Sequence, residues 1–183
     1  MKRQKIIMSW SKVIIEVGKT GENDAMSTAL FSVGTINDKS TSMTVSDGDT
    51  LEAKATGGVT VAEEESEPGI EITYRVKEMD FDTEGMFTGA KENADGELVV
   101  KTNIVDDDFS IKITPKNIGA KGLKARRTHV KFRPGHSEEE GSYVDVTHKI
   151  LECEDEELYR YFRVGAEDKE NIKLASDIKA GNV

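Results

Sequence analysis

Alternating apolar and polar positions predict several half-buried β-strands in this sequence. The clearest pattern is in residues 69–77, GIEITYRVK, where Ile70, Ile72, Tyr74 and Val76 share one face and charged or polar residues share the other. The same period of two predicts further strands, which are 13–17, 30–36, 109–115, 130–133 and 144–150. Pro115 ends one of them, because proline cannot donate to a sheet ladder.

One segment between the strands has helical spacing instead. In MDFDTEGMFTG, residues 79–89, Asp80 or Asp82 can cap a helix at its start and Gly89 can end it. Gly85 within it makes the expected helix short or irregular. Residues 157–164, ELYRYFRV, are a final strand candidate that could also form a helical turn.

The pattern divides the chain into one domain with extensions, as its length of 183 residues suggests. Residues 11–164 form the predicted domain, preceded by a flexible segment, 1–10. Within the domain, the polar segment 37–58 predicts a long projecting hairpin, with Asp47 and Gly48 as its turn. Residues 165–183 are polar with weak helical spacing, so we expect a C-terminal arm that becomes ordered on a partner.

Charge and cysteine content limit the classes of function. Thirty-five acidic residues against 25 basic ones give a net charge of -10, which argues against a nucleic-acid reader. The single cysteine, Cys153, excludes an internal disulfide and fits a reducing cytoplasm. The first ten residues lack the apolar stretch of a secretory signal, and no run is long enough to cross a membrane.

Histidines and glutamates gather at RPGHSEEEG, where His136 precedes Glu138, Glu139 and Glu140. If Val130 and Val146 on the flanking strands both lie on the core face, paired positions of this hairpin have equal parity, because directly opposed residues point the same way. His129 and His148 then face opposite sides of the sheet. They could not then hold one metal ion together. His136 is expected to lie in the turn between the strands, and the glutamates are expected to form a solvated part of it.

Three other clusters are better explained by structure than by chemistry. Asp106 to Asp108 lack the alternating ligands and glycine of a calcium loop. Residues 119–124, GAKGLK, lack the ending of a phosphate-binding loop and are expected to form a turn. Residues 121–133 are a basic island without stacking aromatics. We therefore expect no catalytic residue, no cofactor and no metal site, and we expect the island to contact an acidic patch on a neighbouring subunit.

The order of these features resembles the major tail tube proteins of tailed bacteriophages and prophages. The resemblance covers residues 11–164 and is carried by the short first strand, the long polar hairpin and three stretches: GIEITYRVKEMDFDTEGMFTG, FSIKITPKNIGAKGL and PGHSEEEGSYVDVTHKILECEDEELYRYFRV. It implies a mainly β subunit, sandwich-like or barrel-like, with one short flanking helix. Such subunits form six-membered rings with a continuous inner barrel, and the rings stack into a tube.

The resemblance also implies a role and partners. The protein would be a structural component of a virion tail, assembled in the bacterial host cytoplasm, without a cofactor or membrane insertion. Its partners would be copies of itself, a tape-measure protein, a baseplate initiator and a tail terminator, with DNA only passing through the lumen. Candidate residues follow from this role: Glu71 and Asp145 for an acidic lumen, Asp47, Gly48 and Asp49 for contacts between rings, and Lys121, Lys124, Arg126 and Arg127 for contacts between subunits.

Two other classes of function compete with this hypothesis. A β-sandwich that binds a glycan or host surface would present exposed aromatics in a groove, and an aromatic content of 6% disfavours it. An enzyme would need His136 or His129 in a pocket with carboxylates, which the parity of the strands makes difficult.

Overall fold

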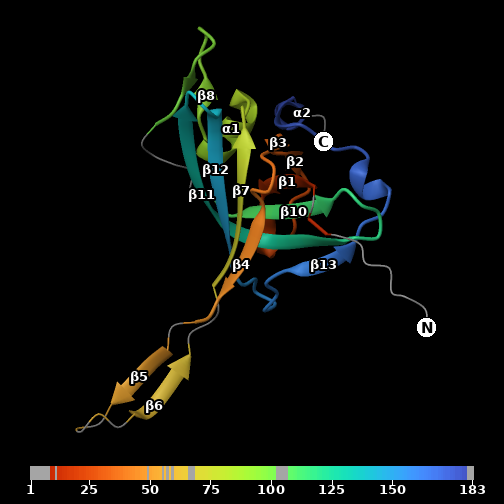
Figure 1. Cartoon of the computed structure of the whole chain (residues 1–183). Helices are drawn as coiled ribbons and strands as arrows, with labels where there is room; N and C mark the ends of the chain where they lie inside the picture. Colours follow the sequence, from red (N-terminus) through yellow and green to blue (C-terminus); the bar gives the residue numbers. More distant parts are fainter. Residues whose placement is uncertain are drawn as a thin grey trace.

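The main body of the protein is a curled antiparallel sheet, from which a two-stranded arm projects (Figure 1). The computed structural model describes residues 9–10, 12–48, 50–54, 56, 58, 60–65, 69–101 and 107–180. In this part of the chain the sheet runs in the order β2-β1-β10-β11-β12-β7-β3, with β13 beside β11 and β4 beside β7. Its strands are β1 (Val13–Lys19), β2 (Phe31–Ser32), β3 (Thr35–Ile36), β4 (Ser42–Ser46), β7 (Gly69–Lys77), β10 (Phe109–Pro115), β11 (Lys121–Ser137), β12 (Gly141–Ile150) and β13 (Arg160–Arg163).

The smaller elements lie around this sheet. Two short helices, α1 (Phe81–Thr88) and α2 (Ala175–Lys179), lie next to each other (Figure 1). Two separate strand pairs complete the fold, namely β5 (Thr50–Lys54) with β6 (Thr60–Glu65) and β8 (Lys91–Glu92) with β9 (Leu98–Val99). Single 3-10 turns occur at Glu22–Asp24 and Glu167–Lys169. The predicted fold class, mainly β with a short helix, is confirmed.

The longest strand, β11, connects the two parts of the sheet because its halves have different neighbours. Its first half lies between β10 and β13, and from Thr128 onward it pairs with β12. The ladder with β10 shifts register between Phe109 and Ile111, an irregularity of the kind that bends a strand and increases its twist. The change of partner along one continuous strand lets the sheet curl instead of remaining flat.

The hydrophobic core lies on one face of the sheet and is closed by α1. Alternate residues of β7 and β12 point into it, as the period of two predicts. Phe87 of α1 joins the helix to the sheet, since its ring centroid lies 5.4 Å from that of Phe109, 5.6 Å from Phe132 and 6.1 Å from Phe31. Buried core residues include Ile15, Val17, Val33, Ile72, Tyr74, Val76, Ile111, Ile113, Leu123, Val144 and Val146.

Helix α1 begins and ends at the predicted capping residues. The Asp80 carboxylate accepts hydrogen bonds from the Thr83 N–H at 2.8 Å and from the Thr83 hydroxyl at 2.9 Å. Gly89 ends the helix in the left-handed region, with φ of 71°, where glycine carries no steric penalty. Of the two predicted caps, Asp80 is thus the one used, and Asp82 instead forms an ion pair with Lys179 of α2.

Replacing Asp80 with alanine is expected to lower the free energy of unfolding by about 1 kcal/mol, because the first turn of α1 loses its cap. Chemical denaturation of the variant would measure the change. The control is Asp95→Ala, an exposed carboxylate outside the helix, which should change stability by less than about 0.5 kcal/mol. Equal losses for both variants would contradict a capping role.

Two strand predictions in the first third of the chain were wrong in detail. The expected strand at 30–36 is divided into β2 and β3, because Gly34 lies between them with φ of 98°. Asp47 and Gly48 are not the turn of a hairpin. They connect β4 with the arm strand β5, because β4 pairs with β7, with Met43 opposite Ile72 and Val45 opposite Ile70. The arm is therefore β5–β6.

Three predictions in the second half also need correction. The segment 119–124 is only partly a turn: Gly119 has φ of 81°, but β11 begins at Lys121. His136 belongs to β11, and the turn is limited to residues 138–140. The C-terminal segment is not a free arm up to residue 180, since Ala175 is buried in the core and the Ser32 N–H donates to the carbonyl oxygen of Lys173 at 2.8 Å.

Candidate functional site

The two predicted acidic residues lie on the side of the sheet opposite the core. Glu71 is on β7 and Asp145 is on β12, and both side chains are half-buried. We call this side of strands β4, β7, β12 and β11 the polar face. The cross-strand register defines it as Ser42, Thr44 and Ser46 of β4, Glu71, Thr73, Arg75 and Lys77 of β7, Tyr143, Asp145, Thr147 and Lys149 of β12, and His129, Lys131, Arg133 and Gly135 of β11.

Arg75 is the centre of an ordered cluster on the polar face. Its Nε donates to Asp145 Oδ1 at 2.7 Å and its Nη2 donates to Asp145 Oδ2 at 2.9 Å, while Nη1 donates to Glu140 from the β11–β12 turn. The guanidinium carbon lies 4.0 Å from the centre of the Tyr143 ring. The hydrogen bond to Asp145 raises the pKa of Arg75, which therefore stays charged.

Glycine is required at position 135 for this cluster. A Cβ atom there would lie 2.6 Å from atoms of the Tyr143 ring, closer than side chains pack. The ring therefore lies against bare backbone of β11 on one side of the cluster and under the Arg75 guanidinium.

The polar face ends at two open edges. Among the described residues, no strand pairs with the outer edge of β4, and none pairs with the edge of β11 from Val130 to Ser137 that points away from β12. Val45 on β4 is apolar and 56% exposed, which is unusual for a residue on the core face of a sheet. On β11, Pro134 has no N–H to offer along its edge.

The backbone hydrogen bonds show which groups these edges present. The Leu151 N–H donates to Arg127, so odd residues of β11 bond to β12 and even residues, Val130 and Phe132 among them, point outward. The Glu78 N–H donates to Ser142, so odd residues of β7 bond to β4. The outward groups of β4 are therefore those of Met43 and Val45.

Four of the cations in the basic island have partners within the subunit, and two of them, Arg126 and Arg127, form ion pairs. Arg126 forms ion pairs with Asp155 and Glu157, and Arg127 with Asp108 at 2.6 Å and Asp24 at 3.8 Å. The two predicted lysines contact aromatic rings of β13, with Lys121 Nζ 4.7 Å from the Tyr161 centroid and Lys124 Nζ 4.6 Å from that of Phe162. The structure thus places these four side chains on the first half of β11, apart from the polar face on its second half. Their proposed contact with another subunit stays a prediction.

The predicted contacts between rings lie at the base of the arm. Asp47 is exposed and Gly48 is half-buried in the connection from β4 to β5, while Asp49 lies outside the described residues.

A buried relay of hydrogen bonds was not foreseen from the sequence. The Thr128 hydroxyl donates to the Phe109 carbonyl at 2.7 Å, so His148 Nδ1–H must donate to Thr128 Oγ1 at 2.8 Å. His148 Nε2 then accepts from the Tyr74 hydroxyl at 2.9 Å. Burial lowers the pKa of His148 to about 3 and raises the pKa of Tyr74, so both are neutral at pH 7. Only the face of His148 was predictable, from its parity.

A second ion cluster lies on β1 and β10, on the face of these strands that points away from the core. Lys112 Nζ is 3.1 Å from Asp168 Oδ1 and 3.7 Å from Glu16 Oε2. Burial raises the pKa of Glu16, and Lys112 partly offsets the effect. The C-terminal turn at Glu167–Lys169 supplies Asp168, so this cluster fastens the C-terminal segment to the sheet.

The histidines are distributed as their parity predicts. His148 is buried on the core face and His129 lies on the polar face, so they are on opposite sides of the sheet.

Among the described residues, no group of three His, Cys, Asp or Glu side chains could hold a metal ion. No described helix has both the length and the apolar character needed to cross a bilayer. Asp107 and Asp108 form ion pairs with Lys19 and Arg127, and Asp106 lies outside the described residues.

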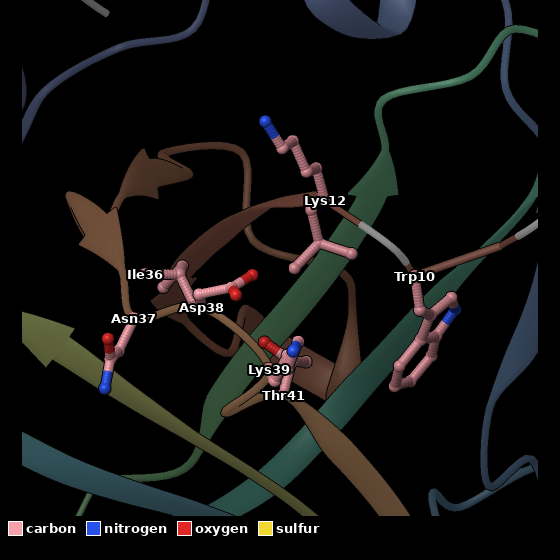
Figure 2. Close-up of a pocket in the computed structure, with 8 residues that line it drawn as sticks. Trp10, Lys12, Ile36, Asn37, Asp38, Lys39 and Thr41 are labelled. Carbon is pink, nitrogen blue, oxygen red and sulfur yellow. The ribbon is translucent and has the colours of Figure 1, made fainter.

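A hollow of about 530 Å³ lies between the start of β1 and the segment that joins β3 to β4 (Figure 2). Trp10 and Lys12 lie on one side and Ile36 and Asn37 on the other, with Asp38, Lys39 and Thr41 between them. Its lining joins one aromatic ring to charges of both signs, without a buried polar group that would orient a ligand.

Comparisons with known proteins give distant structural likenesses. No protein-family model matches the sequence, and no curated protein is significantly similar to it. The solved structures similar to this chain include the tube terminating cap of the anti-feeding prophage, with 8% identity over 90% of this chain and 96% of that chain at a TM-score of 0.38. They also include two structures of an extracellular contractile injection system. The PVC sheath/tube terminator has 11% identity over 88% and 99% of the two chains at 0.37, and the PVC sheath-tube complex has 12% identity over 86% and 93% at 0.36. With TM-scores below 0.5, these likenesses do not by themselves assign a function.

Proposed function

We propose that this protein is a structural subunit that assembles through its open sheet edges into rings, which stack into a tail-like tube. The observation that carries the proposal is the match between the outer edges of β4 and β11. Within the described ranges each edge presents unpaired backbone groups, and such edges in soluble proteins are either protected or used for pairing.

The two edges match in strand direction. From β4 through β7 and β12 to β11, each strand is antiparallel to the next. Strands β4 and β11 consequently run in opposite directions, so β4 of one copy placed beside β11 of the next continues the antiparallel pattern. The contact joins two different surfaces, which is the arrangement that forms a ring when the rotation between copies closes.

The edges also match in hydrogen bonding and in side-chain face. The outward backbone groups belong to Met43 and Val45 on β4 and to Val130 and Phe132 on β11, and all four side chains are on the core face. Hydrogen-bonded residues that oppose each other point to the same side, so apolar side chains meet across the contact. The polar faces of neighbouring copies then become continuous. Pairing of this kind would also cover Val45.

A ring built this way has a lumen or an outer surface formed by the polar face, and the resemblance to tail tube proteins favours the lumen. The arm β5–β6 projects beyond the body of the subunit (Figure 1), where it can reach a copy in the next ring. A six-membered ring, contacts with a tape-measure protein, an initiator and a terminator, and a place in a phage-like particle are parts of the same proposal. We keep residues 11–164 as the assembling domain, with residues 165–180 packed against it.

Replacing Val45 with proline is expected to abolish ring and tube formation while leaving the monomer folded. The proline removes an N–H that points out of the subunit, so no bond within the sheet is lost. Negative-stain electron microscopy and light scattering of concentrated protein would measure assembly, and circular dichroism would measure folding.

The matched control is Val45→Thr, which keeps the N–H and the β-branched shape. It should still assemble. If Val45→Pro assembles as well as the wild type, the β4 edge is not the contact. If the wild type forms no rings or tubes even with an initiator present, the proposed function is wrong.

A further inference from the structure

We infer that the polar face binds an acidic polypeptide. In the proposed ring this face lines the lumen, so the geometry of the site rests on the proposed function, whereas the charge of the face belongs to each subunit. The partner is defined by its chemistry, a chain with carboxylates at intervals, and not by a particular sequence.

The charge of the polar face is opposite to that of the whole chain. The protein carries a net charge of -10, yet the face has five cationic side chains against two carboxylates of its own strands and the carboxylate of Glu140, which reaches Arg75 from the β11–β12 turn. The strand carboxylates are Glu71 and Asp145, and the cations are Arg75, Lys77, Lys131, Arg133 and Lys149. The two predicted acidic residues are thus outnumbered, and an object that lies against this face meets an excess of positive charge.

Three of these cations have no carboxylate partner in the described part of the chain. Asp145 binds Arg75, and Glu71 lies directly across from Lys149 in the ladder. Lys77, Lys131 and Arg133 are exposed, and no described carboxylate lies within 4.0 Å of them. They can therefore bind carboxylates of a partner without first breaking an ion pair of their own.

The pattern fits a polypeptide better than a nucleic acid. Double-stranded DNA carries one charge about every 1.7 Å along its axis, so it would set phosphates against Glu71 and Asp145 as well as against the cations. A polypeptide can place its carboxylates on the cations and neutral residues elsewhere. The Thr147 hydroxyl can hydrogen-bond to it, whereas the hydroxyls of Ser42 and Thr73 hydrogen-bond to each other at 2.8 Å. Tyr143 offers no free ring face for a base, because Arg75 covers it.

The test uses fluorescein-labelled poly-L-glutamate, with labelled poly-dT of equal length as the alternative ligand. Binding is measured by anisotropy with unassembled protein and by co-sedimentation with tubes. The variant K77Q/K131Q/R133Q is expected to bind polyglutamate at least about tenfold more weakly, since it loses three ion pairs. The control K91Q/K101Q/K116Q removes the same charge from exposed lysines off the polar face, and it should stay within about twofold of the wild type.

A variant with the opposite charge change guards against misfolding of the triple variant. Glu71→Gln removes one carboxylate from the face and is expected to strengthen polyglutamate binding. Equal weakening by both triple variants, no binding by the wild type, or tighter binding of poly-dT than of polyglutamate would overturn the inference. Tube formation is scored separately by microscopy, so tubes that do not bind polyglutamate contradict only this inference, and binding by a protein that never assembles contradicts only the proposed function.

Discussion

Replacing Phe87 with alanine is expected to lower the free energy of unfolding by about 3–5 kcal/mol, the cost of a large cavity in a packed core. The Phe87 ring is 3% exposed and lies among Phe31, Phe109 and Phe132. It is the side chain by which α1 contacts aromatic residues from three separate strands. Its removal leaves a void that the surrounding rings fill only in part, since they are held by their own strands.

Chemical denaturation at pH 7 would measure this loss. The matched control is Phe81→Ala, because Phe81 is in the same helix and is 49% exposed. We expect that variant to lose less than about 1 kcal/mol. A loss for Phe87→Ala no larger than that of Phe81→Ala would show that α1 is not fastened to the sheet by this ring.

The wild-type protein is expected to lose stability as the pH falls from 6.5 to 4.5. Replacing His148 with glutamine is expected to abolish most of this pH-dependent loss. Burial lowers the pKa of His148 to about 3 in the folded state, from an ordinary value of 6.5 in the unfolded state. Between these values the unfolded chain binds a proton that the folded chain does not. The contribution of His148 to the free energy of unfolding is therefore fully present above pH 6.5. It decreases by about 1.4 kcal/mol for each unit by which the pH is lowered below that value.

The measurement is the free energy of unfolding of both proteins at several pH values in this window. The difference between wild type and variant isolates His148, because carboxylates contribute equally to both. Burial raises the pKa of Glu16 and of Glu84, so each of these groups adds stability as the pH falls. This contribution is the same in both proteins and cancels when the two profiles are subtracted. Parallel pH profiles for wild type and His148→Gln would show that His148 does not stay neutral in the fold.

Tyr74→Phe separates the effect of burial from that of the hydrogen bond. The variant loses the hydroxyl that donates to His148 Nε2, so we expect lower stability at pH 7. The pH dependence should persist, because burial is the cause of the lowered pKa. A pH profile as flat as that of His148→Gln would assign the effect to the hydrogen bond instead.

Local sequence patterns were sufficient to predict the strands that have one apolar and one polar face. β7 and β10 were predicted from alternation alone, because each has a row of apolar residues against a row that is polar or more exposed. The caps of α1 were predictable because Asp80 and Gly89 act on backbone groups within one turn. The opposite faces of His129 and His148 followed from hairpin parity, which depends only on neighbouring strands.

Pairing between distant segments could not be predicted in this way. The Asp47–Gly48 dipeptide predicts a hairpin locally, but the apolar face of β4 is satisfied by β7, which follows after the whole arm. β11 continues through Gly122 because Phe162 of β13 packs against that glycine, where a Cβ atom would lie 2.4 Å from the ring. The open edges were also out of reach, since an edge is defined only once the order of all strands is known.

The candidate site shows the same division. Alternation placed Glu71 and Asp145 on the polar side of their strands, but it could not show that cations of β11 lie beside them on the same face. Net charge suggested an acidic lumen, whereas the register of four strands collects lysines and arginines on the polar face proposed to line it. A sum over the sequence does not reveal how charge is distributed over a folded surface.

In the chain β5 follows β4 and β6 precedes β7, and in the proposed assembly this order has a consequence for the sequence of steps by which a tube grows. A lone pair of strands is only marginally stable in water, so the direction of β5–β6 depends on how firmly its root is held. Once β4 pairs with a neighbouring copy, the base of the arm is held in place and the orientation of the arm is fixed. Closure of one ring would then orient its arms for contact with the next ring. Columns of single subunits stacked without ring closure are therefore disfavoured as intermediates.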